Sequence, residues 1–224
     1  MYNAGRREGS CSIGATAPSS DFYLAEGAVG YEVGFTTYVL VQNPNGSENE
    51  VSITYQLPTG PVVGPKFTMK PNSRQTIKVN EGMPANTDVS TVVHGSKPLV
   101  AERAMYWDND TGPAFHASIG LASPHTVFML PDGQTSLGFE TWTLVENPNS
   151  KPVEVVIHYL PAGGGKTITF TDTIPAGSRR SYSMAGKVPV GRASIMVASD
   201  SNIIVERSMY KDNRGAGTDT IGAY

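Results

Sequence analysis

The chain has 224 residues and a formal net charge of −3, with 17 Lys and Arg against 20 Asp and Glu, so we expect one or two domains and no nucleic-acid partner. No apolar run approaches the ~20 residues of a membrane-spanning helix, and the first residues lack the apolar region of a signal peptide, so we expect no membrane insertion. The single cysteine, Cys11, excludes an intramolecular disulfide and a cysteine-based metal site.

Residues 1–19 are the first element in chain order, and their two ends recur twice. Met1-Tyr2 and Ser12-Ile13-Gly14 return at residues 105–106 and 118–120, and again at residues 209–210 and 220–222. The sequence thus predicts a partial repeat at 1–19, the tail of a preceding module, and one tail more than there are bodies. We expect a terminal tail either to pack on a neighbouring molecule, linking subunits head to tail, or to fold back on its nearest module.

The first body, residues 20–122, shows the alternation of short β-strands. Val51, Ile53, Tyr55 and Leu57 alternate with polar residues, which is typical of a half-buried strand. Gly and Pro, 24 and 16 in number, separate such runs as turns do. Further strands are predicted around residues 34–43, 77–79, 89–93 and 99–105. Helix content should be low.

The second body, residues 123–224, repeats the first. Gly34-Phe35 through Asn43-Pro44-Asn45 returns as Gly138-Phe139 through Asn147-Pro148-Asn149, and Glu102-Arg103 returns as Glu206-Arg207, both at an offset of 104. Six to eight short strands in about 100 residues are typical of a two-sheet sandwich. The sequence therefore predicts an all-β chain of two tandem immunoglobulin-like β-sandwich modules, with their boundary near residues 121–126.

Charged pairs on the last strand of each body are the strongest candidate site residues. Neighbours on a strand point to opposite faces, so one member of Glu102-Arg103 and one of Glu206-Arg207 must face the core or a surface between modules. An unpaired charge there is costly, which predicts structural ion pairs. We expect Arg103 to pair with Glu26 and Arg207 with Asp132, each within its own module.

Metal and catalytic motifs are weak. His94, His116, His125 and His158 do not recur between the bodies, so we expect surface or loop histidines and not ligands. Asp108-Asn109-Asp110 resembles the start of a calcium loop but lacks the later Glu, which favours a polar turn and leaves calcium binding open. Residues 163–166, Gly-Gly-Gly-Lys, lie between predicted strands and indicate a turn. We expect no catalytic residue, cofactor or metal, although two acids converging in a cleft would favour a glycosidase-like site.

The repeated motifs resemble a family of tandem β-repeats in large bacterial secreted and surface proteins. The residues that carry the resemblance are Ala25-Glu26-Gly27, Gly34-Phe35, Asn43-Pro44 and Glu102-Arg103-Ala104-Met105-Tyr106. The chain is more loosely similar to bacterial immunoglobulin-like surface domains. The second body departs from the pattern at Pro131-Asp132-Gly133 and at Lys211, where Trp107 stands in the first.

The resemblance implies an extracellular or cell-surface structural role. We expect a non-enzymatic repeat protein, acting as a spacer, stalk or assembly subunit of a surface or filamentous structure, with copies of itself or adjacent repeats as partners. The alternative is a carbohydrate-binding or adhesive module, which predicts an exposed aromatic strip and glycan partners.

Overall fold

The computed structural model describes residues 9–109 and 112–224 and is nearly all β. The strands of the first half are β1 (Ser19–Leu24), β2 (Ala28–Val29), β3 (Thr36–Asn43), β4 (Asn49–Leu57), β5 (Gly60–Met69), β6 (Ser73–Lys78), β7 (Thr87–Asp88), β8 (Ser90–Asn109) and β9 (Gly112–Ile119). Those of the second half are β10 (His125–Leu130), β11 (Phe139–Asn147), β12 (Val153–Pro161), β13 (Ile168–Ile174), β14 (Ser178–Ser183), β15 (Ala193–Lys211) and β16 (Ala216–Ile221). Two 3-10 turns, η1 (Val79–Gly82) and η2 (Met184–Gly186), are the helical segments of the described chain. The predicted all-β class is confirmed.

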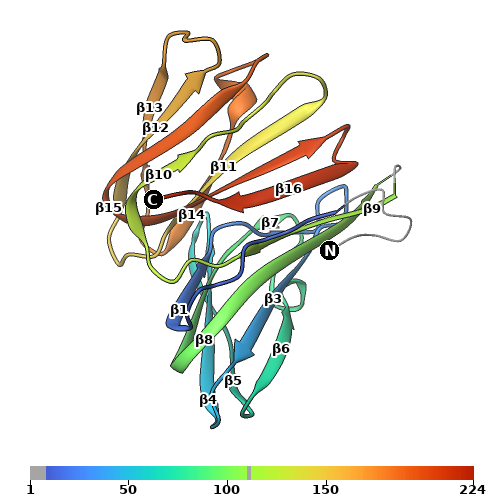
Figure 1. Cartoon of the computed structure of the whole chain (residues 1–224), viewed down its shortest axis with the longest axis vertical. Helices are drawn as coiled ribbons and strands as arrows, with labels where there is room; N and C mark the ends of the chain where they lie inside the picture. The colour runs from blue at the N-terminus through green and yellow to red at the C-terminus, as the bar shows by residue number, and fades with distance from the viewer. Residues whose placement is uncertain (1–8, 110–111) are drawn as a thin grey trace.

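Each half forms one curled sheet, and the two sheets share one strand order. The first runs β5-β4-β8-β3-β6, with β1 and β9 also paired to β8; the second runs β13-β12-β15-β11-β14, with β10 and β16 paired to β15. The curl follows from the long strand. The beginning of β8 pairs with β1 and β4, whereas its end pairs with β3 and β9. Figure 1 shows the two curled sheets one above the other.

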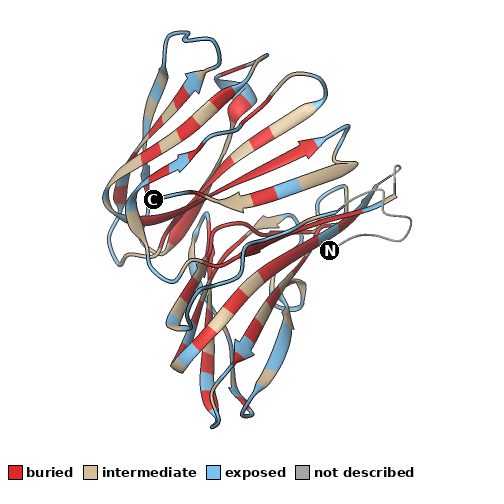
Figure 2. Ribbon diagram, viewed as in Figure 1, coloured by how far each residue is buried: buried red, intermediate tan, exposed pale blue. Residues whose placement is uncertain are grey.

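Each curled sheet encloses its own apolar core, as the inner faces in Figure 2 show. Phe22, Val41, Ile53 and Val93 are buried in the first core. Phe128, Val145, Ile157 and Val197 are their counterparts in the second. On β3, the alternation places Val39 inward and leaves Tyr38 and Leu40, which share the other face, half-buried.

The repeated Asn-Pro turns are built by the buried asparagine side chains. Asn43 Nδ2 donates to the carbonyls of Ser47 and Lys70, and Asn147 Nδ2 does the same for Lys151 and Ile174. Each amide thus satisfies backbone carbonyls of two neighbouring segments. This explains why the motif recurs in both halves.

The tails complete the bodies that precede them. Strand β9 pairs with β8, and β16 pairs with β15. The tail at residues 9–14 lies instead along the free edge of β9, where Ser10 Oγ and Ser12 Oγ accept from the backbone N–H groups of Ala117 and Ile119. The described part of this tail therefore folds back on the first half, which was one of the two expected arrangements.

Candidate functional site

The two halves meet in a buried joint, which is the main polar feature of the molecule. Strand β16 packs along β9, and β14 packs against β4 and β5. An aromatic cluster links the halves, because Trp107 and Phe35 of the first contact Tyr210 of the second at ring-centroid distances of 5.5 and 6.0 Å. A Cβ on Gly217 would lie 2.7 Å from the Trp107 ring, so only glycine permits this approach of β16.

Arg103 lies at the centre of the joint. Its Nη2 is 2.8 Å from Asp219 Oδ1, and neither side chain is more than 1 % exposed. Its Nη1 is 2.8 Å from His116 Nδ1. Arg103 is the buried member of the Glu102-Arg103 pair, but its predicted partner, Glu26, is wrong. Because β16 lies along β9, the acid that reaches Arg103 comes from the other half.

Glu26 is bound to the second half through its backbone. The Glu26 N–H donates to Glu206 Oε2 at 2.7 Å, and Tyr210 Oη donates to Glu26 Oε1 at 3.4 Å. Burial raises the pKa of Glu26 to about 7, and the neighbouring Asp219 adds to the shift. Burial also raises the pKa of Glu206 well above its usual value.

The second predicted pair forms within its own half, as expected. Arg207 Nη1 lies 3.7 Å from Asp132 Oδ2, and it also donates to the Asp132 carbonyl at 3.2 Å. Glu102 is half-buried on the face opposite to Arg103, as the strand geometry requires. Its counterpart Glu206 is fully buried, because the first half covers that face of the second.

A second ion pair crosses the joint, and no sequence pattern predicted it. Arg179 Nη1 lies 3.0 Å from Asp88 Oδ2, and Asp88 also accepts from Ser181 Oγ and Tyr31 Oη. Close to Arg179, Glu146 is fully buried with both carboxylate oxygens lacking a hydrogen-bond partner. Burial raises the pKa of Glu146 well above its usual value, although Arg179 opposes the shift.

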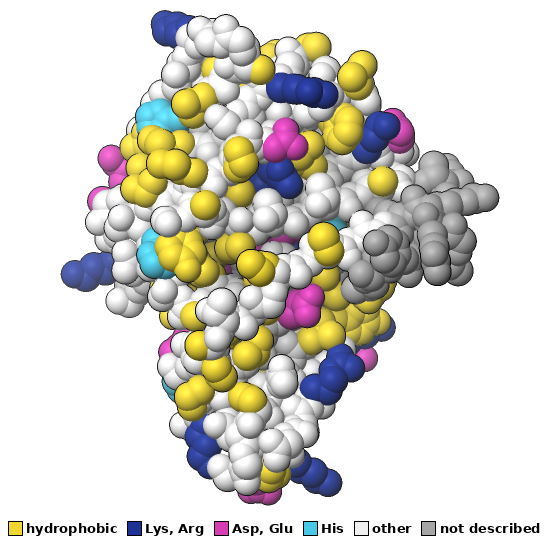
Figure 3. Space-filling view, in the orientation of Figure 1, with side chains coloured by type: hydrophobic (Ala, Val, Ile, Leu, Met, Phe, Trp, Pro, Cys, Tyr) yellow, Lys and Arg dark blue, Asp and Glu magenta, His cyan; other side chains and the backbone are white. Residues whose placement is uncertain are grey.

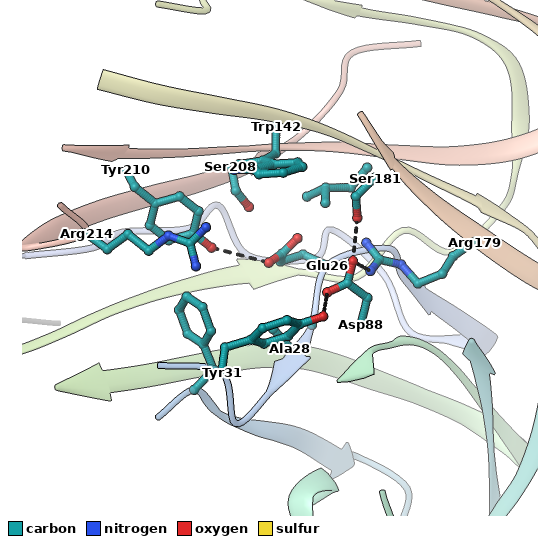
Figure 4. A pocket seen from close by; sticks show the side chains of 13 residues that line it. Glu26, Ala28, Tyr31, Asp88, Trp142, Arg179, Ser181, Ser208, Tyr210 and Arg214 are labelled. Carbon is teal, nitrogen blue, oxygen red and sulfur yellow. Dashed lines mark hydrogen bonds and ion pairs between the residues drawn. The ribbon is translucent and has the colours of Figure 1, made fainter. Parts of the chain in front are cut away.

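A cavity of about 160 Å³ lies between these groups. Figure 4 shows Trp142 on one side and Tyr31 on the other, with Glu26, Asp88 and Arg179 between them. Arg214 closes one end and pairs with Glu140 at 2.6 Å. The cavity therefore combines aromatic walls with paired charges.

The histidine prediction is wrong for one residue of the four. His116 is fully buried, and burial together with the nearby Arg103 lowers its pKa well below its usual value. A neutral His116 accepts from Arg103, so it is a joint residue and not a surface one. His94 and His158 bond Asp21 and Thr169 in exposed positions, and His125 stacks on Tyr224.

The described residues contain neither a metal-binding cluster nor a helix that could span a membrane. Within 9–109 and 112–224, no three His, Cys, Asp or Glu side chains gather as a metal site would need. Asp110 of the candidate calcium turn lies outside the described residues. Residues 163–166 form the turn between β12 and β13 that the sequence predicted. Neither helical turn of the described chain has the length and hydropathy of a membrane span. Lys and Arg are scattered on the face in Figure 3.

Comparison with known proteins does not identify a family for this chain. No family model and no curated protein matches the sequence. A Thermotoga maritima structure, "1070", aligns at a TM-score of 0.43 and 14% identity, over 46% of this chain and 94% of that chain. The Anabaena sensory rhodopsin transducer aligns at a TM-score of 0.34 and 22% identity, over 42% of this chain and 98% of its own. A Streptomyces avermitilis alpha-L-rhamnosidase aligns at a TM-score of 0.25 and 6% identity, over 94% of this chain and 28% of its own. At these TM-scores the likenesses carry no argument about function.

Proposed function

We propose that the chain is a non-enzymatic structural repeat protein, a spacer or assembly subunit of an extracellular or cell-surface structure. In this proposal residues 20–122 and 123–224 are immunoglobulin-like β-sandwich modules, and residues 1–19 are the tail of a preceding repeat. The partners are copies of the same chain or adjacent repeats.

The buried joint is the observation that supports this proposal. A spacer has to hold its repeats in one relative orientation, and two ion pairs with directional hydrogen bonds fix orientation more strictly than apolar contact alone. Arg103–Asp219 and Arg179–Asp88 join the halves at two separate places. The repeated motifs and their resemblance to surface repeats support the extracellular location.

A non-enzymatic role is supported by the way Asp88 and Glu206 are held. Asp88, which lines the cavity, accepts from Arg179, Ser181 and Tyr31 together, so its oxygens are committed to the joint. A catalytic nucleophile or base needs an oxygen directed at its substrate. Glu206 is fully buried and accepts from the Glu26 backbone.

Small-angle X-ray scattering and electron microscopy of the purified chain test the proposal. We expect scattering that fits one fixed arrangement of the two halves, and end-to-end particles that lengthen as concentration rises. The matched variant Asp219→Asn should broaden the distribution of dimensions. Scattering that requires freely reoriented halves, or a strict monomer at high concentration, would contradict the proposed role.

A further inference from the structure

The cavity at the joint has polar groups that the joint itself does not use. Glu26 Oε2 and the Nε and Nη2 atoms of Arg179 are buried without a hydrogen-bond partner, and both residues line the cavity. Glu26 is 5% exposed and Arg179 1%. Since buried polar groups in folded proteins are almost always paired, these atoms indicate a polar ligand between the halves.

The charge of the cavity favours a neutral ligand. Each guanidinium beside it already has a carboxylate, Arg179 with Asp88 at 3.0 Å and Arg214 with Glu140 at 2.6 Å. An anion would face Asp88, and a cation would face Arg179. Glu26, with its pKa near 7, has a carboxyl group that can both donate and accept at neutral pH. Hydroxyl groups also donate and accept, so they match the free polar atoms of Glu26 and Arg179.

The walls favour a ring with apolar faces. Trp142 and Tyr31 lie on opposite sides of the cavity, and Phe35 lines it beside Tyr31. Aromatic faces carry partial negative charge and attract the C–H groups of a saturated ring. Tyr31 is held at a φ of 60°, a conformation that is strained for a bulky residue, and its N–H donates to Asn86 Oδ1 at 2.6 Å. Such strain is concentrated at ligand sites.

The cavity is large enough for one small ring. A volume of about 160 Å³ corresponds to roughly five waters at the ~30 Å³ that each occupies in the liquid. Tyr31, which lines the cavity, is 40% exposed, so the cavity is not sealed from solvent. We propose that this cavity binds a single neutral pyranose sugar between Trp142 and Tyr31, with its hydroxyl groups bonded to Glu26 and Arg179.

Tryptophan fluorescence tests the site directly, because the chain has only two tryptophans. In Trp107→Phe, Trp142 is the single reporter. The probes are methyl β-glucopyranoside, methyl β-galactopyranoside and N-acetylglucosamine, each titrated to high millimolar concentration. We expect at least one sugar to give a saturable change, and acyclic sorbitol to give none. Isothermal titration calorimetry of the unaltered chain with the same sugars guards against a folding defect in the variant.

Two further substitutions complete the test. Tyr31→Ala should weaken binding about tenfold or more, since it removes one wall. Tyr38→Ala, at the position equivalent to Trp142 on the first half, should leave binding unchanged. The proposal is overturned if none of the three sugars binds saturably by either method, if sorbitol binds equally well, or if Tyr31→Ala binds as tightly as the unaltered chain. None of these results bears on the structural role of the joint, which scattering tests separately.

Discussion

The same face of the repeated sheet is open in the first half and covered in the second. Gln42 and Arg74 are opposite each other on β3 and β6, and both are exposed. Glu146 and Arg179 occupy the equivalent positions on β11 and β14, and both are buried by the first half. Both halves share the strand framework. The charged residues differ in environment, because this face is covered by the other half only in the second half. Matched substitutions at equivalent positions can therefore separate the fold from the joint.

The largest expected difference is between Arg103 and its counterpart Arg207. Arg103→Ala leaves Asp219 buried and unpaired, which should lower the free energy of unfolding by about 3–5 kcal/mol. Arg207→Ala should cost less, because its partner Asp132 is 63% exposed and remains solvated. Urea denaturation of both variants measures the difference. Equal losses in the free energy of unfolding would show that burial in the joint does not strengthen the contribution of Arg103 to stability.

Arg179 and Arg74 give the next comparison. Arg179→Ala removes the ion pair with Asp88, whose side chain is 31% exposed, and we expect a loss of about 1.5–3 kcal/mol, as for hydrogen bonds to charged groups. Arg74→Ala on the open face should change stability by no more than about 0.5 kcal/mol. A larger loss for Arg74 than for Arg179 in denaturant midpoints would contradict the assignment of the covered face.

The sequence predicted the strands, the repeat and the burial of one member of the Glu102-Arg103 pair, because each of these can be seen in the order of residues along the chain. It did not predict Asp219 as the partner of Arg103, because those residues are brought together only when β16 packs along β9. Asp88 was missed for the same reason, because Arg179 and Ser181 lie on the other half. His116 was missed because it does not recur at its equivalent position and bonds Arg103 from the neighbouring strand β9. Glu26 was predicted to pair with Arg103, whereas its backbone N–H donates to Glu206 of the other half.

Substitutions at Glu146 and at its counterpart Gln42 should differ in how their effect on stability depends on pH. A buried Glu146 with a raised pKa holds its proton in the folded chain at pH values where the unfolded chain has lost it, so its contribution to stability falls as pH rises above about 4.5. Glu146→Gln should therefore raise stability by at least about 1 kcal/mol at pH 8 and have little effect at pH 4. Gln42→Glu on the open face should be neutral at both. Thermal melts across this range check the sign, and a Glu146→Gln gain confined to acidic pH would refute it.

The smallest expected difference is between Ser181 and Thr76, equivalent positions opposite Leu144 and Leu40. Ser181 Oγ donates to Asp88 across the joint at 2.8 Å, and Thr76 is exposed. Ser181→Ala should cost about 1 kcal/mol, and Thr76→Ala less than about 0.5 kcal/mol. Chemical denaturation resolves the two if each is measured against the unaltered chain. Indistinguishable values would mean that the Ser181 hydrogen bond has no net effect.

Differential scanning calorimetry tests most directly whether the buried joint makes the two halves one cooperative unit. The account predicts a single transition for the unaltered chain, with calorimetric and van't Hoff enthalpies in agreement. In Asp219→Asn it predicts that the transition broadens or separates into two. Two independent transitions in the unaltered chain, unchanged by Asp219→Asn, would contradict it.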